Sequence, residues 1–167
     1  MSMRKLQGTT IWYGIAFLIM AVLFYSSSQT YAQQSQIGTL HHVLANEPLK
    51  DVFAQFPIHY GGDVTDASRN YFKYVEFFMR KFAHFSTYFI LGMAWYMAIH
   101  KQLGNWFIAA FIAWQAATGY AGLDEFHQSL TGGRSPMFAD VMLDSAGALT
   151  AVILTVVIQA IWRRIHA

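Results

Sequence analysis

The chain has 167 residues, enough for one domain, and only 12% of them are charged while 55% are hydrophobic and 17% aromatic. Soluble domains carry about 25% charged residues, so this composition excludes most soluble classes and indicates a protein covered by lipid. The net charge of +2 is too small to indicate nucleic-acid binding, and the lack of cysteine excludes disulfide frameworks, thiolate metal sites and thiol nucleophiles.

Four stretches are long and apolar enough to cross a bilayer, which takes about 20 residues of helix. They are residues 8–25, 82–100, 105–123 and 141–162. The short connection around Lys101 favours antiparallel packing of the second and third stretches. The sequence therefore predicts an all-α, polytopic membrane protein with four transmembrane helices in an antiparallel bundle, forming a single domain over residues 1–167.

The charges predict the orientation of these four spans. The two chain ends and the Lys101 turn would share one side, which carries five basic and no acidic residues, whereas the other side carries six basic and all nine acidic residues. The positive-inside rule places the first set in the cytoplasm. Residues 26–81 and the motif loop 124–140 would then face outward, as expected for a protein of the bacterial plasma membrane with cytoplasmic termini.

The first span has an alternative interpretation as a secretory signal cleaved after Ala32, because Arg4 and Lys5 precede the apolar run and Thr30-Tyr31-Ala32 resembles a cleavage site. Cleavage would leave the outward motifs where they are. We interpret the segment as an uncleaved helix.

The outer segment, residues 26–81, is the main polar stretch. Apolar spacing predicts a short helix over 31–45, and Gly61-Gly62-Asp63 predicts a turn. The second helix is expected to begin near Asp66 and to run about 35 residues, with an aromatic outer half (71–78) at the membrane interface.

Ionisable side chains at membrane depth are costly and usually mark a function, and here they gather at the outer helix ends. On the second helix, Lys81, His84 and Tyr88 share one face, with Arg80 beside them. This face is one wall of a predicted outward-opening pocket.

The other walls come from the third and fourth helices. If the third helix continues through residues 124–128, then Asp124, His127 and Gln128 share a face and Glu125 points elsewhere. Asp140 and Asp144 share a face of the fourth helix with Gly147, and Gly132-Gly133-Arg134 lies between the two helices.

Each group also has a structural interpretation. Arg80 and Lys81 would snorkel to the headgroups, His84 would be a hydrogen-bonded core histidine, and Asp144 would pair with Arg134 or Lys81. A structural salt bridge needs only two partners, however, and this cluster has more than six polar members of mixed sign, which favours a binding site.

Two motifs resemble the signatures of the VanZ-like membrane protein family. The first is Arg80-Lys81-Phe82-Ala83-His84-Phe85, followed by Tyr88, Leu91 and Gly92. The second is Asp124-Glu125-Phe126-His127-Gln128, followed by Gly133-Arg134, Asp140-Val141 and Gly147-Ala148. Ser27-Ser28-Gln29 also fits the family, and the outer loop is the part that the resemblance covers poorly.

The resemblance implies a bacterial plasma-membrane protein of the teicoplanin resistance protein VanZ-like group. The family's namesake contributes to low-level resistance to glycopeptides such as teicoplanin, by an unsettled biochemical mechanism. The family commonly has Asn where this sequence has Asp144, so the resemblance implies hydrogen bonding rather than a charge at that position.

The first functional hypothesis is an enzyme acting on an anionic, lipid-linked substrate of the cell envelope. Arg134 and Lys81 would hold a phosphate, and a histidine would act as general acid or base. The candidate catalytic residues are His84, His127, Asp124 and Glu125. The candidate substrate-binding residues are Arg80, Lys81, Tyr88, Gln128, Arg134, Asp140 and Asp144.

The cofactor is left open: His84, Asp124, His127 and Asp140 are acceptable ligands for a divalent cation, but their spacing is not a metal signature. The second hypothesis is a non-catalytic binder of lipid headgroups, cell-wall precursors or a glycopeptide. A transporter is the least favoured, because the sequence has no paired repeats. Membrane lipids are the expected partners, nucleic acid is not, and the oligomeric state is left open.

Overall fold

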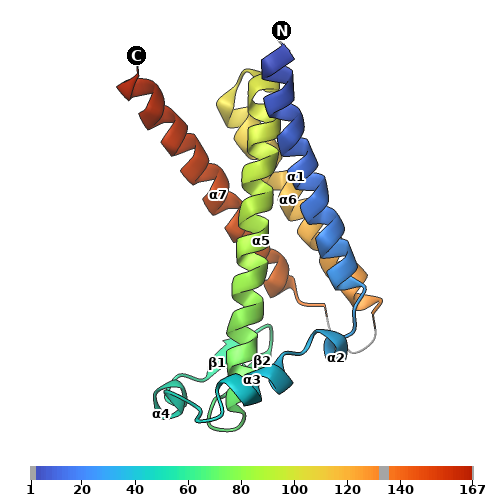
Figure 1. The fold of residues 1–167 in the computed structure, drawn as a ribbon, viewed down its shortest axis with the longest axis vertical. Coiled ribbons are helices and arrows are strands. Elements are labelled where there is room, and N and C mark those ends of the chain that lie inside the picture. Colours follow the sequence, from blue (N-terminus) through green and yellow to red (C-terminus); the bar gives the residue numbers. More distant parts are fainter. Residues whose placement is uncertain (1–2, 132–135, 167) are drawn as a thin grey trace.

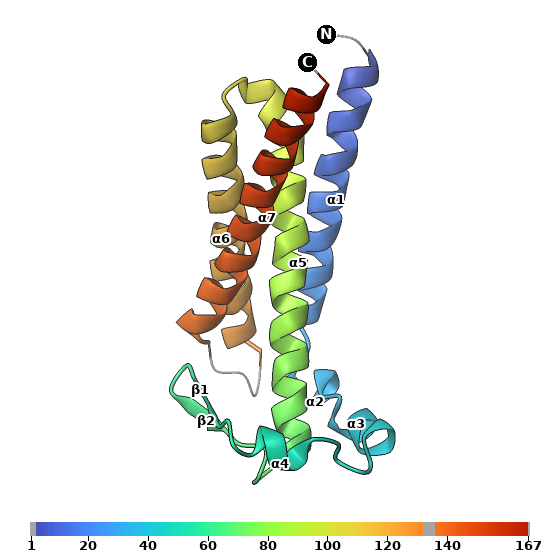
Figure 2. The same ribbon diagram turned by 90° about the vertical axis from the view of Figure 1, so that its left-hand side faces the viewer.

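The structure is a computed structural model and describes residues 3–131 and 136–166, with side chains from residue 9 onward. Four long helices dominate it: α1 (Met3–Ser27), α5 (Tyr71–Leu103), α6 (Trp106–Ser129) and α7 (Phe138–Ile165). Consecutive long helices run in opposite directions, so the start of α1, the α5–α6 turn and the end of α7 lie at one end (Figures 1 and 2).

Three of these helices contain segments long and apolar enough to cross a membrane: Thr9–Ser27, Tyr71–Leu103 and Phe138–Ile165. Their outward faces expose large apolar side chains such as Phe17, Leu18 and Ile158, as a lipid-covered surface requires. The chain is therefore a helical membrane protein. α6 is not among the three, because Gln115 and the tryptophans and tyrosine of this helix lower its mean hydropathy.

α5 is the central helix and packs against α1, α6 and α7. Its contact with α7 depends on two glycines, since a Cβ on Gly92 would lie 2.7 Å from the carbonyl oxygen of Ala148 and a Cβ on Gly147 would lie 2.5 Å from that of Phe85. The face of α6 toward the bundle is a row of fully or almost fully buried alanines at four-residue spacing, Ala109, Ala113, Ala117 and Ala121. Small residues of this kind let helix backbones approach closely in lipid.

The outer segment forms three short helices and a hairpin: α2 (Tyr31–Gln34), α3 (Ile37–Val43), α4 (Lys50–Phe53), β1 (Ile58–Tyr60) and β2 (Asp63–Thr65). The strands pair antiparallel with Ile58 opposite Thr65. Gly61 and Gly62 form the turn with φ of +59° and +92°, which glycine adopts without strain and which suits the twist of a two-residue hairpin. The turn was predicted, but its two strands were not, so the fold is not purely α.

The predicted helix over 31–45 is two helices, and the predicted start of α5 near Asp66 is wrong. Residues 66–70 form a turn in which the Asp66 carboxylate accepts from the Ser68 amide at 2.7 Å. The Ser68 side chain, and after it this amide, lowers the pKa of Asp66. α5 begins at Tyr71, because the Asn70 side chain accepts from the Lys73 amide at 2.9 Å and caps the helix.

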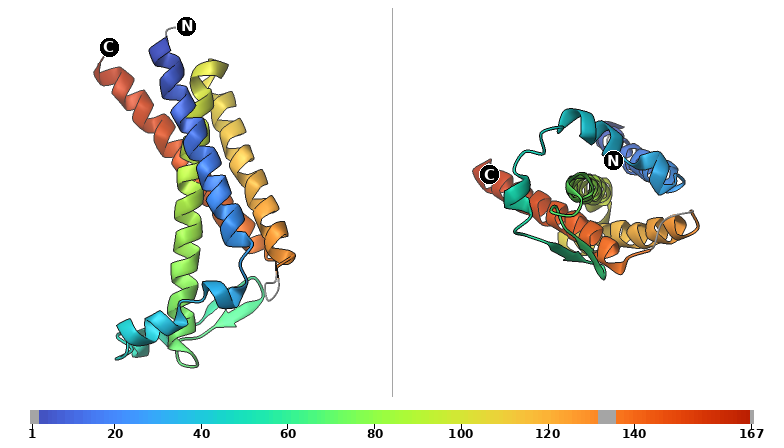
Figure 3. Two further views of the ribbon diagram at one scale, coloured as in Figure 1. Left: turned by 45° about the vertical axis from the view of Figure 1, so that its right-hand side comes forward. Right: turned by 90° about the horizontal axis from the view of Figure 1, so that it is seen from below.

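The first turns of α5 extend beyond the ends of the other long helices (Figure 1). The outer segment lies around this extension (Figure 3). Tyr71, Phe72 and Tyr74 are buried there, and the first two pack against Leu40 of α3. These three aromatic residues therefore contact protein, whereas Phe78 of the same half is exposed. That this half lies at the membrane interface stays a prediction.

Candidate functional site

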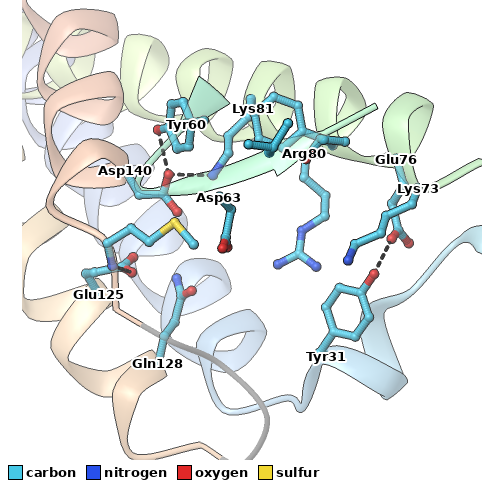
Figure 4. A pocket seen from close by; sticks show the side chains of 14 residues that line it. Tyr31, Tyr60, Asp63, Lys73, Glu76, Arg80, Lys81, Glu125, Gln128 and Asp140 are labelled. Atoms are coloured by element: carbon cyan, nitrogen blue, oxygen red, sulfur yellow. Dashed lines mark hydrogen bonds and ion pairs between the residues drawn. The ribbon is translucent and has the colours of Figure 1, made fainter. Parts of the chain in front are cut away.

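A pocket of about 440 Å³ lies where the extension of α5 faces the hairpin and the outer ends of α6 and α7 (Figure 4). Side chains from α2, β1, β2, α5 and α6 and from the beginning of α7 line it. Five of the predicted site residues are among them: Arg80, Lys81, Glu125, Gln128 and Asp140.

One wall of the pocket is an ion pair. The Lys81 ammonium contacts the Asp140 carboxylate, and the Tyr60 hydroxyl donates to the same carboxylate at 2.6 Å. The ammonium also lies 4.4 Å from the centre of the Tyr60 ring. Burial raises the pKa of Tyr60, and its hydrogen bond to Asp140 raises that pKa further, so the phenol stays protonated as a donor. Lys81 is thus bound by Asp140 and does not snorkel freely.

The opposite wall centres on Glu76 of α5, whose side chain is almost fully buried. Its carboxylate accepts from the Tyr31 hydroxyl at 2.7 Å, from the Ser35 hydroxyl at 2.9 Å and from the Gln36 amide. These three hydrogen bonds hold the connection between α2 and α3 against α5, so that the two short helices stay separate and both are attached to α5. Burial, with the Glu76 hydrogen bond, raises the pKa of Tyr31.

The pocket contains cations without a carboxylate partner. Within the part of the chain that the structure describes, neither Arg80 nor Lys73 lies within 4.0 Å of a carboxylate. The Arg80 guanidinium lies 5.2 Å from the centre of the Tyr31 ring and points into the pocket (Figure 4). Arg80 and Lys73 are therefore available to a ligand.

A second polar layer lies one helical turn deeper. The His84 Nδ1 is 3.3 Å from the Asp144 Oδ2, which joins α5 to α7 directly below the Lys81–Asp140 pair. The Asp144 Oδ1 is buried and has no hydrogen-bond partner among the described residues. The Tyr88 hydroxyl is also buried, and it approaches Asp124 without forming a well-oriented hydrogen bond.

Asp124 ties α6 to α1. It accepts from the Ser27 hydroxyl and, at 3.1 Å, from the Gln128 amide of its own helix. α6 does continue through residues 124–128, as expected. His127, however, turns toward α1 and stacks on Phe24 with ring centres 4.4 Å apart, outside the pocket lining.

Glu125, a candidate catalytic residue that was expected to point away from the face of Asp124, His127 and Gln128, lines the pocket together with Gln128. Its carboxylate accepts from the Met137 amide at 2.6 Å, and this hydrogen bond holds the first residues of α7 against α6. Arg134 lies outside the described residues. The described residues hold no group of three His, Asp or Glu side chains arranged for a metal ion.

Sequence reasoning missed nine of the fourteen residues that line the pocket, among them Tyr31, Tyr60, Asp63, Lys73 and Glu76. Two of them, Lys73 and Glu76, could have been predicted, because they recur with Arg80 at i, i+3 and i+7 and so share a face of α5. The aromatic residues around them drew the interpretation toward lipid contact instead.

The fold and the pocket define a class: a helical membrane protein with a mixed-charge pocket at one end of its long helices. The family model described as VanZ/LLP1 matches residues 12–159, and the chain belongs to this family. The match spans all the elements that build the pocket. No curated protein and no solved structure matches the chain.

Proposed function

We propose that the pocket binds a phosphate-bearing, lipid-linked molecule at the outer face of the bacterial plasma membrane. The observation that carries this proposal is the position of Arg80 and Lys73, which form no ion pair with a described carboxylate, beside Glu76 and Asp140, which have their own donors. Glu76 accepts from three groups, and Asp140 is held by Lys81 and Tyr60. A planar guanidinium matches phosphate oxygens with two parallel hydrogen bonds.

The proposal includes the orientation and the fourth span. α6 would cross the membrane beside α5, α1 and α7 as part of an antiparallel four-helix bundle. The basic Arg163 and Arg164, together with Lys101, lie at the end opposite the pocket, which supports a cytoplasmic position for that end. The pocket would then open toward the outer leaflet, where lipid headgroups and lipid-linked wall precursors are found.

Binding is favoured over catalysis because neither predicted catalytic histidine lines the pocket. His127 stacks on Phe24, and its Nδ1 is buried without a partner among the described residues. A general acid or base must lie within hydrogen-bond reach of the group it serves.

An enzyme remains the second candidate, and the His84–Asp144 pair favours it. A carboxylate bound to one ring nitrogen fixes the orientation and tautomer of the histidine, as in acid–base sites. The side chain of His84 is 27% exposed and lies one turn below Lys81.

The binding proposal is tested by calorimetric titration of the full chain in amphipol with dihexanoyl phosphatidic acid, with dihexanoylglycerol as the phosphate-free probe. Arg80→Gln should weaken binding of the phosphate probe about 10- to 100-fold, the worth of a charge-assisted hydrogen bond. Arg163→Gln, which removes an exposed arginine at the other end, is the matched control and should leave the affinity unchanged. Equal losses in both variants would contradict the proposal.

The same variants separate the two candidates. His84→Gln should leave phosphate binding within about threefold, because a binding role assigns His84 no contact with the headgroup. If the wild type releases phosphate from the probe and His84→Gln abolishes the release without weakening binding, the enzyme reading is correct.

A link to glycopeptides follows from the same proposal. A pocket that holds a phosphate-bearing wall precursor would shield the target of teicoplanin, and the family resemblance implies low-level resistance to this glycopeptide. Expression of the wild type should raise the teicoplanin concentration that a Gram-positive host survives, and Arg80→Gln should remove that effect while Arg163→Gln retains it.

A further inference from the structure

The three cations of the pocket, Lys73, Arg80 and Lys81, all come from α5. The same helix carries the carboxylate of Glu76, which already accepts from three donors of residues 31–36. The other carboxylates, those of Glu125, Asp140 and Asp63, come from α6, α7 and β2. Figure 4 shows the Arg80 guanidinium on one side of a central space that Asp63, Glu125 and Gln128 border on the other.

Asp63 is the decisive group on the anionic side. Its side chain is exposed at the hairpin and points into the pocket (Figure 4). It forms no ion pair with Arg80 or with any other described cation within 4.0 Å. The two opposite charges therefore face the same space without neutralising each other.

Two further acceptors stand beside Asp63. Glu125 accepts the Met137 amide through Oε1 and has no described partner at Oε2. Gln128 donates its amide to Asp124, which leaves its carbonyl oxygen without a described donor. A ligand in this space therefore meets a hydrogen-bond donor and positive charge at one end and several acceptors at the other.

A ligand that is only anionic does not suit this arrangement, because Asp63 and Glu125 would repel the part of it that lies away from Arg80. A ligand with a phosphate at one end and an ammonium group at the other would satisfy both sides. Three donors of a primary ammonium group match the acceptors of Asp63, Glu125 and Gln128.

We propose that the pocket selects a zwitterionic headgroup, a phosphodiester with a primary ammonium group about two carbons from the ester oxygen, as in a phosphoethanolamine group. This inference rests on the proposed function and adds the cationic half of the ligand. Arg80 and Lys73 bind the phosphate, and Asp63, with Glu125 and Gln128, binds the ammonium group.

The test compares two probes that differ in one group. Dihexanoyl phosphatidylethanolamine carries the ammonium group, and dihexanoyl phosphatidylpropanol has a methyl group in its place with the same chain length and phosphodiester charge. Both are titrated into the full chain in amphipol. The wild type should bind the amine probe about tenfold more tightly, and Asp63→Asn should reduce that preference to threefold or less.

Asp51→Asn is the matched control, because Asp51 is an exposed acidic residue of α4 outside the pocket lining. It should keep the full preference for the amine probe. Equal affinities of the wild type for both probes, or equal behaviour of Asp63→Asn and Asp51→Asn, would overturn the zwitterion inference. Thermal unfolding of each variant shows that the fold is intact.

The outcomes also separate this inference from the proposed function. If both probes bind equally and Arg80→Gln weakens both, the phosphate site stands and the zwitterion inference fails. If neither probe binds, both fail. Water-soluble glycerophosphoethanolamine and glycerophosphopropanol form a third arm, in which an equal amine preference identifies a free headgroup as the source and a preference confined to the lipid probes identifies a membrane lipid.

Discussion

At the residue scale, Glu76 connects the outer segment to the membrane-embedded part of the chain. One carboxylate receives two hydroxyls and a backbone amide from residues 31–36. Because the side chain is almost fully buried, removing the acceptor would leave these donors unpaired. The wall of the pocket that carries Tyr31 therefore depends on this residue.

Glu76→Ala should release the 31–36 segment from α5 while the long helices stay folded. Hydrogen exchange at the Gln36 amide should become about 10- to 100-fold faster, which corresponds to the loss of about 1.5–3 kcal/mol of local stability. Glu47→Ala, which removes only a surface pair with Lys50, should leave this exchange unchanged. Slow exchange at Gln36 in Glu76→Ala would show that the carboxylate does not anchor the segment.

The second residue-scale feature is Asp144, whose Oδ2 contacts His84 and whose Oδ1 lacks a partner among the described residues. A neutral amide oxygen can accept the same hydrogen bond without burying a charge. This agrees with the Asn that the family commonly has at this position.

Asp144→Asn should therefore fold as stably as the wild type, or more stably. Asp144→Leu has a similar volume and no acceptor, so it should lower stability by about 1–3 kcal/mol by leaving His84 unpaired. Thermal unfolding in detergent measures both. A large loss in Asp144→Asn would show that the site requires the negative charge.

At the scale of elements, the crossing of α5 and α7 aligns the two polar layers. Gly92 and Gly147 bring the backbones together, so that Lys81 meets Asp140 and His84 meets Asp144 one turn below. The same-face spacing of these residues was readable from the sequence, since they recur at helical intervals. Which residue of α5 contacts which residue of α7 could not be predicted, because the point at which the two helices cross depends on both of them together.

Gly147→Ala should lower the stability by about 1–3 kcal/mol, because its Cβ would overlap the Phe85 carbonyl oxygen and force the helices apart. Gly122→Ala is the control, since a Cβ there meets nothing within 4 Å and alanine favours the helix. Unfolding midpoints in detergent should fall for the first variant and stay level or rise for the second. The opposite order would contradict the close α5–α7 packing.

At the scale of the whole molecule, the open question is which ends of the long helices face outward and whether α6 crosses the membrane. The chain has no cysteine, so single-cysteine variants each report one position. Ser68, Lys101 and Leu130 suit this test, because all three are exposed and lie in or beside the connections between the long helices.

On intact cells a membrane-impermeant maleimide should label Ser68→Cys and Leu130→Cys but not Lys101→Cys, and permeabilised cells should label all three. Labelling of Lys101→Cys on intact cells would reverse the orientation and place the pocket in the cytoplasm. Protection of Leu130→Cys together with Lys101→Cys would show that α6 does not cross the bilayer.

The sequence by itself determined the membrane class, the four long helices, their polar faces and the family. These follow from composition and from helical spacing, which are properties of short stretches of chain. The hairpin strands, the break between α2 and α3, the start of α5 and the pocket walls made by Tyr31, Tyr60 and Glu76 were decided only by the tertiary structure. The break between α2 and α3 and the pocket walls depend on hydrogen bonds between residues 40 or more positions apart, such as Tyr31 with Glu76 and Tyr60 with Asp140, and such partners cannot be inferred from a short stretch of sequence. The hairpin and the start of α5 depend on short-range pairings, Ile58 with Thr65 and Asn70 with Lys73, whose geometry only the structure shows.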